Sequence, residues 1–307
     1  MTPVRPRILA LSALFAAGAL ALSACGGDDD AGTAAAATTP KTEADAAVDE
    51  AEAPTPDRTI TFTATDFAFT GPATVEAGVV ELAVDNQGAE DHQLGLFLLH
   101  DGVDAGTVLG AVGAAGTLEA GREYGTWIAG PNLVAPTKEG SVVMDLRPGH
   151  YLVACVMPSA SDGQPHAMKG MLANLEVTPT NAPAAAIGDS ELPTIQLKDF
   201  EFVLPDDFTG HDPVIVENDG SQIHELAIVR LEDGKTPDDV LAYEMQPPPR
   251  TNPPFTSIGG TTFLDPGERV RLDLDLEPGE YALVCYLPAP DKQMHAQHGM
   301  LQVFSVR

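Results

Sequence analysis

The sequence predicts an all-β protein made of two tandem Greek-key β-sandwich domains. Short runs alternate between apolar and polar side chains, as in residues 59–65 (TITFTAT) and residues 79–85 (VVELAVD). A period of two is typical of strands that have one buried face. Gly, Asn and Pro follow these runs and mark the turns between them. The same motifs occur twice along the chain at a nearly constant spacing, which indicates a duplicated sandwich domain.

The charge of the chain argues against nucleic acid as a partner. The 307 residues include 16 Lys and Arg against 45 Asp and Glu, for a formal net charge of -29. Binding to phosphate groups needs clustered Lys and Arg, which this composition does not supply. The acidic balance favours a cationic ligand or partner instead. The 29 Gly and 26 Pro suit a protein rich in turns.

The first 24 residues are expected to be a signal peptide. Arg5 and Arg7 precede an apolar run at residues 8–22, which is too short for a comfortable membrane span. The stretch Leu-Ser-Ala-Cys that ends at Cys25 resembles the lipoprotein box of bacteria. This resemblance implies a lipid on Cys25, which would anchor the protein in the cell envelope, on the extracytoplasmic side of a bacterial membrane. The alternative is an ordinary secretory signal that is cut near Ala24.

The remaining chain divides by composition and by its repeat. Residues 25–57 are mostly Ala, Thr, Asp, Glu, Gly and Pro, and so few large apolar side chains cannot offset the entropy lost on ordering. We interpret this segment as a disordered acidic tether. The first domain is then residues 58–178, the linker is residues 179–191, and the second domain is residues 192–307.

One short helix is expected in each domain, at equivalent positions. Residues 236–243 (TPDDVLAY) begin with a threonine cap, followed by a proline and two acids in the first turn. Residues 103–112 are the counterpart in the first domain.

Each domain contains the same two motifs. The first is Asn-x-Gly-x-x-x-His. The second begins as Pro-Gly-x-Tyr-x-x-x-Cys and, after a loop, ends as His-Ala-x-x-Gly-Met. The motifs occupy residues 86–92, 148–155 and 166–171 in the first domain and residues 218–224, 278–285 and 295–300 in the second.

These motifs bring together residue types that bind copper. Alternation along a strand places the Tyr and the Cys of the second motif on one face, and the following loop delivers a His and a Met. The first motif supplies another His from a different strand. Two imidazoles, a thiolate and a thioether match the His₂Cys site with an axial Met that is described for blue copper proteins.

On these motifs, residues 59–177 and 192–306 each resemble a cupredoxin, a domain of the plastocyanin and azurin type. The resemblance implies up to two copper ions, one in each domain. The ligands that it implies are His92, Cys155, His166 and Met171 in the first domain, and His224, Cys285, His295 and Met300 in the second.

The chain also departs from the family pattern. The loops between each Cys and the following His are longer than in single-domain electron carriers and are closer to those of copper nitrite reductases. The His-x-His pairs of multicopper oxidases do not occur in the sequence. Ala154 and Val284 stand where copper nitrite reductases have a histidine. We therefore expect that the protein is not an enzyme.

Three functions remain open. The first is a membrane-anchored one-electron carrier with a type 1-like copper site in each domain. The second is a copper storage or delivery protein that uses the same ligands, and the third is a metal-free β-sandwich binding module of the cell envelope. A redox protein, or a donor or acceptor of copper, is expected as the partner. A disulfide between Cys155 and Cys285 is the structural alternative to metal binding.

The sequence also predicts different reduction potentials for the two sites. Glu90 and Asp91 precede His92, whereas Gln222 and Ile223 precede His224. Carboxylates stabilise Cu(II), the more highly charged state, by Coulomb attraction. The first site should therefore have the lower potential.

Overall fold

The computed structural model describes residues 55–181, residue 187 and residues 192–307. Cys25, the expected signal peptide, nearly all of the expected tether and most of the expected linker lie outside these residues. In the described part of the chain, no helix is long and apolar enough to cross a membrane. We call residues 58–178 the first copy and residues 192–307 the second copy. These boundaries stay a prediction.

The first copy is mainly β. Its strands alternate in burial, as in β1, where Ile60, Phe62 and Ala64 point inward. The strands are β1 (Arg58–Thr65), β2 (Ala68–Thr70), β3 (Thr74–Glu76), β4 (Gly78–Asn86), β5 (Gly95–Leu99), β6 (Gly125–Ala129), β7 (Glu139–Leu146), β8 (Gly149–Ala154) and β9 (Leu172–Thr178). The helices are α1 (Ala105–Ala115) and the short 3₁₀ helices η1 (Leu118–Gly121) and η2 (His166–Lys169).

The second copy repeats this order of elements, without counterparts of β3 and η1 among the described residues. Its strands are β10 (Thr194–Lys198), β11 (Glu201–Val203), β12 (Pro213–Asn218), β13 (His224–Leu231), β14 (Phe255–Leu264), β15 (Arg269–Asp273), β16 (Gly279–Val284) and β17 (Leu301–Val306). Its helices are α2 (Pro237–Glu244) and the 3₁₀ helix η4 (His295–His298).

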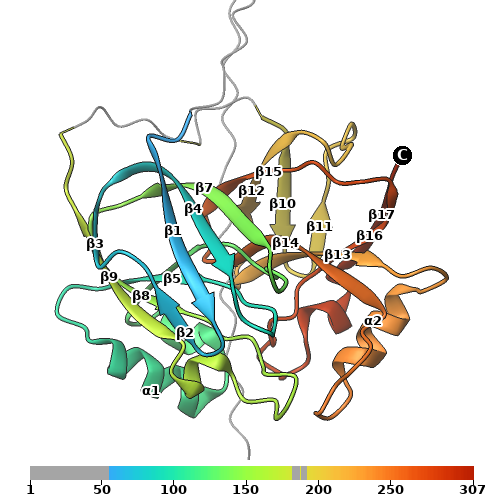
Figure 1. Ribbon diagram of the computed structural model, residues 1–307, viewed down its shortest axis with the longest axis horizontal. Coiled ribbons are helices and arrows are strands. Elements are labelled where there is room, and N and C mark those ends of the chain that lie inside the picture. The colour runs from blue at the N-terminus through green and yellow to red at the C-terminus, as the bar shows by residue number, and fades with distance from the viewer. Residues whose placement is uncertain (1–54, 182–186, 188–191) are drawn as a thin grey trace, which may run out of the picture. The chain divides into compact units, whose positions relative to one another are not determined.

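Two sheets run through both copies (Figure 1). The 8-stranded sheet has the order β11-β10-β12-β15-β7-β4-β1-β2, and the 9-stranded sheet has the order β17-β16-β13-β14-β6-β5-β8-β9-β3. The copies join where β15 pairs with β7 at Arg271 and Val143, and where β14 pairs with β6 at Leu264 and Ile128. Joining edge strands in this way covers unpaired backbone groups that would otherwise be exposed.

One hydrophobic core is shared by the two copies. Trp127 of β6 packs edge-on against Phe263 of β14, with ring centroids 5.0 Å apart. A Cβ atom at Gly95 would lie 2.8 Å from the Phe263 ring, so only glycine leaves room for this ring. The all-β, two-sandwich fold predicted from the sequence is confirmed, and the continuous sheets and core add an extensive contact between the copies.

The two expected helices are present with shifted ends. Helix α2 begins with the expected cap, in which the Thr236 side chain accepts from Asp239 N and the Asp239 carboxylate accepts from Thr236 N. Helix α1 begins after Asp104, whose side chain caps Thr107, and ends at Gly116 in the left-handed conformation with a φ of 71°. The predicted range of 103–112 therefore begins and ends a few residues before the observed helix. The Asp104 cap and the Gly116 stop are the residues that fix its actual ends.

Candidate metal centre

Strands β8 and β16 place the two cysteines. The Tyr151 hydroxyl donates to Arg147 O at 2.6 Å, and the Tyr281 hydroxyl donates to Glu277 O at 2.7 Å. These bonds tie the start of each strand to the turn before it. Cys155 and Cys285, one residue past the strand ends, are buried and free, so the alternative of a disulfide between them is wrong.

The first group of ligand-type side chains, called site one, consists of His92, Cys155 and His166. Their donor atoms all lie within 4.8 Å of one another, and all three residues are buried. The two Nδ1 atoms are 3.1 Å apart, and Cys155 Sγ is 3.5 Å from His166 Nδ1. Three soft donors therefore converge on one small volume.

Site two repeats this geometry with His224, Cys285 and His295. The two Nδ1 atoms are 3.0 Å apart, and Cys285 Sγ is 3.4 Å from His295 Nδ1. These atoms also lie within 4.8 Å of one another and are buried. The structure thus brings together, in each copy, the two His and the Cys that the resemblance implied.

A buried asparagine holds the loop that carries the first histidine of site one. Asn86 Nδ2 donates to Glu90 O at 2.9 Å and to Val134 O at 2.8 Å, while Gly88 N donates to Asn86 Oδ1 at 2.8 Å. A Cβ atom at Gly88 would lie 2.6 Å from His92 Nε2, which explains the glycine of the motif. Asn218 makes the same three bonds in the second copy.

Main-chain hydrogen bonds hold the second loop against the cysteine. Ala167 N donates to Cys155 O at 2.7 Å, and Cys155 N donates to Met171 O at 3.2 Å. Gly170, with a φ of 107°, makes the tight turn between η2 and Met171. The second copy has the same bonds at Ala296, Cys285 and Met300.

Met171 and Met300 lie where the resemblance implied. Both side chains are fully buried, and their main chains lie beside the cysteines. Their role as axial ligands stays a prediction.

Carboxylates lie behind three of the four histidines, and two of these carboxylates, Asp66 and Asp199, were not predicted from the sequence. Asp66 Oδ1 is 3.4 Å from His92 Nε2, and Asp199 Oδ1 is 2.7 Å from His224 Nε2. Glu90 Oε2 is 3.3 Å from His166 Nε2. A partner on Nε2 fixes the ring and leaves Nδ1 to face the site. The repeated Asp-Phe pairs at residues 66–67 and 199–200 were the available signal.

The fourth histidine, His295, has no carboxylate in contact with its ring among the described residues. His295 Nε2 is buried without a hydrogen-bond partner, and so is His92 Nε2, whose contact with Asp66 is the longer one of 3.4 Å. The His295 ring packs edge-on against Phe200, with centroids 5.0 Å apart, as the His166 ring does against Phe67. Burial and the neighbouring His224 lower the pKa of His295 to about 4.

Burial keeps the donor atoms uncharged when no cation is present. Burial raises the pKa of the Cys155 thiol to about 12, although hydrogen bonds from the main chain at Gln93 and Met157 act to lower it. The pKa of Cys285 is raised as well, by burial and then by the charge of Glu225. Burial also lowers the pKa of His92, of His166 and of His224. Neutral imidazoles and a thiol that loses its proton to a cation are the ligand forms that a metal needs.

This donor set fits copper. Two imidazole nitrogens and one thiolate sulfur form the His₂Cys site that is typical of blue copper, and each copy supplies one such set. The cofactor is therefore copper, with up to two ions per chain.

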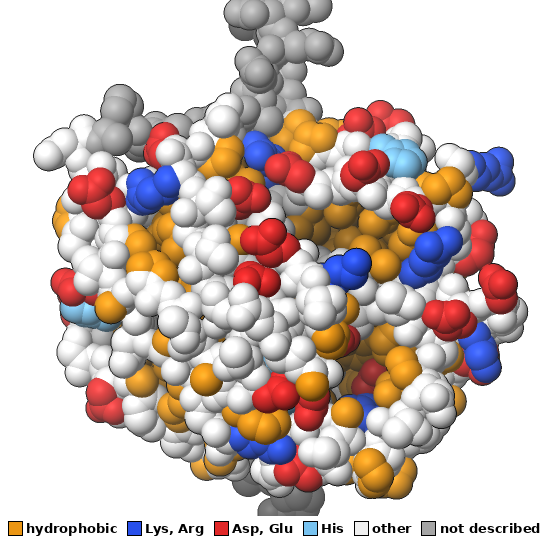
Figure 2. Space-filling view, viewed as in Figure 1, with side chains coloured by type: hydrophobic (Ala, Val, Ile, Leu, Met, Phe, Trp, Pro, Cys, Tyr) orange, Lys and Arg blue, Asp and Glu red, His pale blue; other side chains and the backbone are white. Residues whose placement is uncertain are grey.

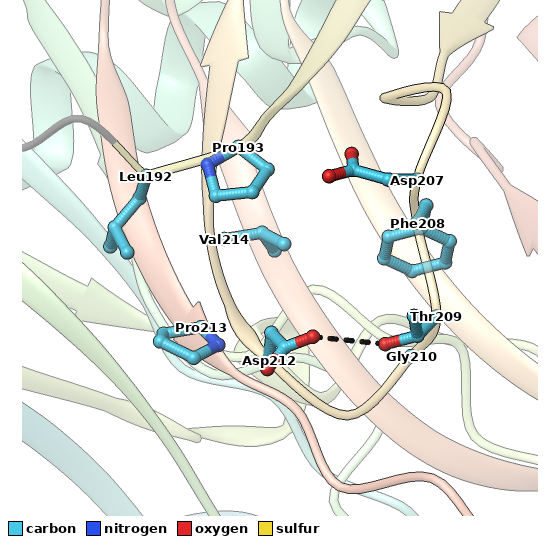
Figure 3. A pocket seen from close by; sticks show the side chains of 9 residues that line it. All are labelled: Leu192, Pro193, Asp207, Phe208, Thr209, Gly210, Asp212, Pro213 and Val214. Carbon is cyan, nitrogen blue, oxygen red and sulfur yellow. Dashed lines mark hydrogen bonds between the residues drawn. The ribbon is translucent and has the colours of Figure 1, made fainter.

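A separate pocket lies in the second copy, away from these residues (Figure 3). Its volume is about 330 Å³, and its lining includes Pro193, Phe208 and Val214. Thr209 and Asp212 join across one side of it by a hydrogen bond of 3.0 Å. None of the eight expected copper ligands lines this pocket.

Comparison with known proteins finds similar chains among solved structures alone. No family model and no curated protein matches the chain. Among solved structures, auracyanin B is 26% identical over 41% of this chain and 92% of its own, with a TM-score of 0.29. A multicopper oxidase is 14% identical over 81% of this chain and 88% of its own, with a TM-score of 0.21. The copper-containing nitrite reductase of Thermus scotoductus is 13% identical over 81% of this chain and 62% of its own, with a TM-score of 0.22.

The prediction that the protein is not an enzyme is wrong, because enzymatic activity is not excluded. It relied on the missing His-x-His pairs and on Ala154 and Val284 before the cysteines. Histidines at those positions would connect a further copper to these sites in one particular way. Their absence does not exclude other catalytic chemistry. The multicopper oxidase and the nitrite reductase that match 81% of this chain overturn the exclusion.

Proposed function

We propose that this chain is a one-electron carrier with a type 1 copper site in each copy. The observation that carries the proposal is the pair of buried His–Cys–His groups with matching geometry. Copper bound there would supply a centre that cycles between Cu(II) and Cu(I). The chain would contribute fixed donors and the exclusion of water.

Burial of the donors favours electron transfer over exchange of the ion. Each of the six His and Cys residues has at most 1% of its surface exposed. An electron can reach such a site through the protein, whereas an ion must pass the loops that cover it. Copper storage or delivery is therefore the less favoured alternative.

Anchoring to a membrane is part of the proposal. It is supported by the lipoprotein-box resemblance at Cys25, which lies outside the described residues. On the face drawn in Figure 2, acidic side chains are spread more widely than basic ones, in line with the net charge of -29. A redox partner with a basic docking face would be attracted to such a surface.

A redox titration tests the proposal. The copper-loaded protein is titrated with one-electron mediators while the thiolate-to-Cu(II) absorption is followed. We expect reversible bleaching with one electron per copper and no loss of copper. Release of copper on reduction would contradict the carrier function and favour delivery of the ion.

A further inference from the structure

The residue that follows the first histidine differs between the two sites. In the first copy it is Gln93, and in the second it is Glu225. Glu225 is 4% exposed and adjoins site two at two points. It follows His224 directly in the chain, and its Oε1 accepts from the main-chain N–H of Tyr286, the residue after Cys285, at 3.0 Å.

The other oxygen of Glu225 reaches the first copy. Oε2 accepts from Asn132 Nδ2 at 3.1 Å. Asn132 is 1% exposed, and its Oδ1 accepts from Leu133 N at 2.9 Å. Asn132 N also donates to Gly260 O of the second copy at 3.1 Å, which holds the residue at the boundary.

The segment after Asn132 leads to site one. Val134 N donates to His92 O at 2.8 Å, and His92 N donates to Val134 O at 3.0 Å. A continuous series of covalent and hydrogen bonds therefore runs from Cys285 through the main chain of Tyr286 to Glu225, and on through Asn132 and Val134 to His92. Cys285, Glu225, Asn132, Val134 and His92 are all buried.

The pseudo-symmetric position provides a comparison. His92 pairs with Val134 as His224 pairs with Leu264, so Thr262 is the counterpart of Asn132. Thr262 is also fully buried and also bonds across the copies, since its hydroxyl donates to Leu94 O at 3.3 Å. The hydrogen bonds of Thr262 across the copies within the described part of the chain go to main-chain carbonyls, of Leu94 and Gly130, so they do not reproduce the link between side chains.

We propose that the bond between Glu225 and Asn132 carries electrons between the two copper sites. The inference rests on the proposed carrier function and extends it, because the chain would then relay an electron internally. An external one-electron donor reduces one site. The electron then passes to the other site, so that Cu(I) at the first becomes Cu(II) while Cu(II) at the second becomes Cu(I), and no proton moves. Electronic coupling falls off more slowly along bonds than across gaps, which is why a bonded route matters.

The experiment uses the full chain loaded with copper at both sites. A pulse generates a small-molecule radical reductant in an amount below that of the protein, and absorption is followed afterwards. Every protein in this experiment carries Met171→Gln. A changed axial ligand shifts the absorption and the reduction potential of site one, so the two sites can be told apart. Adding Cys155→Ser or Cys285→Ser gives the reference spectrum of each site. We expect a redistribution phase whose rate does not depend on protein concentration.

Asn132→Leu removes the link while keeping the branched shape of the side chain, and Glu225→Gln removes one of the two acceptor oxygens of Glu225. We expect each to slow this phase by an order of magnitude or more with copper content retained. The midpoint potentials of both sites are measured in each variant, so that a change in driving force is separated from a change in the route. Thr262→Val is the matched control and should leave the rate unchanged.

The proposed route would be overturned by an unchanged redistribution rate in both Asn132→Leu and Glu225→Gln. It would also be overturned if Thr262→Val slowed the rate equally. Loss of copper from site two in both link variants would also overturn it, because the pair would then be structural. A two-copper protein with no redistribution phase contradicts the relay alone, whereas a parent protein without thiolate-to-Cu(II) absorption contradicts the carrier function itself.

Discussion

Glu119 of the first copy accepts a hydrogen bond from the main-chain N–H of Ile223 of the second copy, with 2.6 Å between Oε1 and N. Ile223 immediately precedes His224, so this bond fixes the approach of a candidate ligand from outside its own sandwich. Arg122 adds a second contact there, since its guanidinium lies 3.3 Å from Ser221 O.

A reciprocal bond exists at the other site. The Ser257 hydroxyl of the second copy donates to Asp91 Oδ2 at 2.5 Å, and Asp91 immediately precedes His92. Each first histidine is therefore positioned in part by the other copy. These bonds add to the continuous sheets and the shared core that join the two sandwiches in one compact unit.

The bond to Glu119 predicts an effect on one site only. Glu119→Ala leaves the buried Ile223 N–H without its acceptor, at a cost of about 1–3 kcal/mol. In a Cys155→Ser background, which keeps site two, we expect copper to bind roughly tenfold more weakly in competition with a chelator. In a Cys285→Ser background the affinity of site one should not change. Glu123→Ala, at an exposed acid nearby, is the control, and equal losses at both sites would contradict the prediction.

The carboxylates around the sites predict the order of their reduction potentials. Site one has Asp66 and Glu90 against its histidines, whereas site two has Asp199 against His224 and the buried Glu225 nearby. Burial raises the pKa of Glu225 to about 7, so below that pH it is mostly uncharged. Although burial opposes it, hydrogen bonds from Ala160, Ser159 and His166 lower the pKa of Glu90, so this carboxylate stays charged. Site one should have the lower potential, because the additional negative charge stabilises Cu(II).

Redox titration of the single-site variants measures this difference. Glu90→Gln in the Cys285→Ser background should raise the midpoint of site one. Asp91→Asn should change it less, because Asp91 turns toward Ser257 and burial raises its pKa. A higher midpoint at site one than at site two would sink the prediction.

Glu225 predicts a dependence of stability on pH. Burial raises the pKa of the Glu225 carboxyl from 4.5 to about 7, although hydrogen bonds from Tyr286 and Asn132 act to lower it. Between these two values the folded protein keeps a proton that the unfolded chain has lost, so the free energy of unfolding falls as pH rises. Over this window the loss is on the order of 3 kcal/mol for a shift of this size.

Glu225→Gln isolates this contribution in the metal-free protein. The variant has no carboxyl to titrate at this position, so the difference in unfolding free energy between parent and variant should change between pH 4.5 and pH 7. Chemical denaturation at several pH values measures it. Contributions of the histidines cancel in the difference, and parallel pH profiles for the two proteins would contradict the prediction.

Much of each sandwich was predictable from local sequence. The alternation in residues such as Ile60 and Phe62 indicates a strand with one buried face, and the repeated Cys and His motifs indicate a shared site. These features depend on neighbours a few residues apart. The duplication then places the same four ligand types in each copy.

The contacts between the copies were not predictable in this way. Pairing of β6 with β14 depends on which edges meet after each sandwich has formed, and periodicity does not encode that choice. Likewise, Asp66 reaches His92 and Asn132 reaches Glu225 only through the folded chain. Glu90 and Asp91 were both predicted to affect site one, with Asp91 on the opposite strand face from His92; the structure places Glu90 against His166 and turns Asp91 toward Ser257.

The proposed anchor predicts where the protein is found in a cell. Replacing Cys25 by alanine removes the residue that would carry the lipid, so Cys25→Ala should leave the membrane fraction and appear in soluble form. Cys155→Ser serves as the control, because it also removes a cysteine but should stay with the membranes. Sedimentation of Cys25→Ala with salt-washed membranes would show that another feature anchors the chain.

Copper stoichiometry combined with absorption tests the central claim most directly. The purified, copper-loaded protein should contain two coppers per chain and show a thiolate-to-Cu(II) band, since each His–Cys–His group supplies one set of donors. Cys155→Ser and Cys285→Ser should each lose one copper and part of the band, and the double variant should lose both. An unchanged copper content and band in the double variant would contradict the assignment of these two groups as the copper sites.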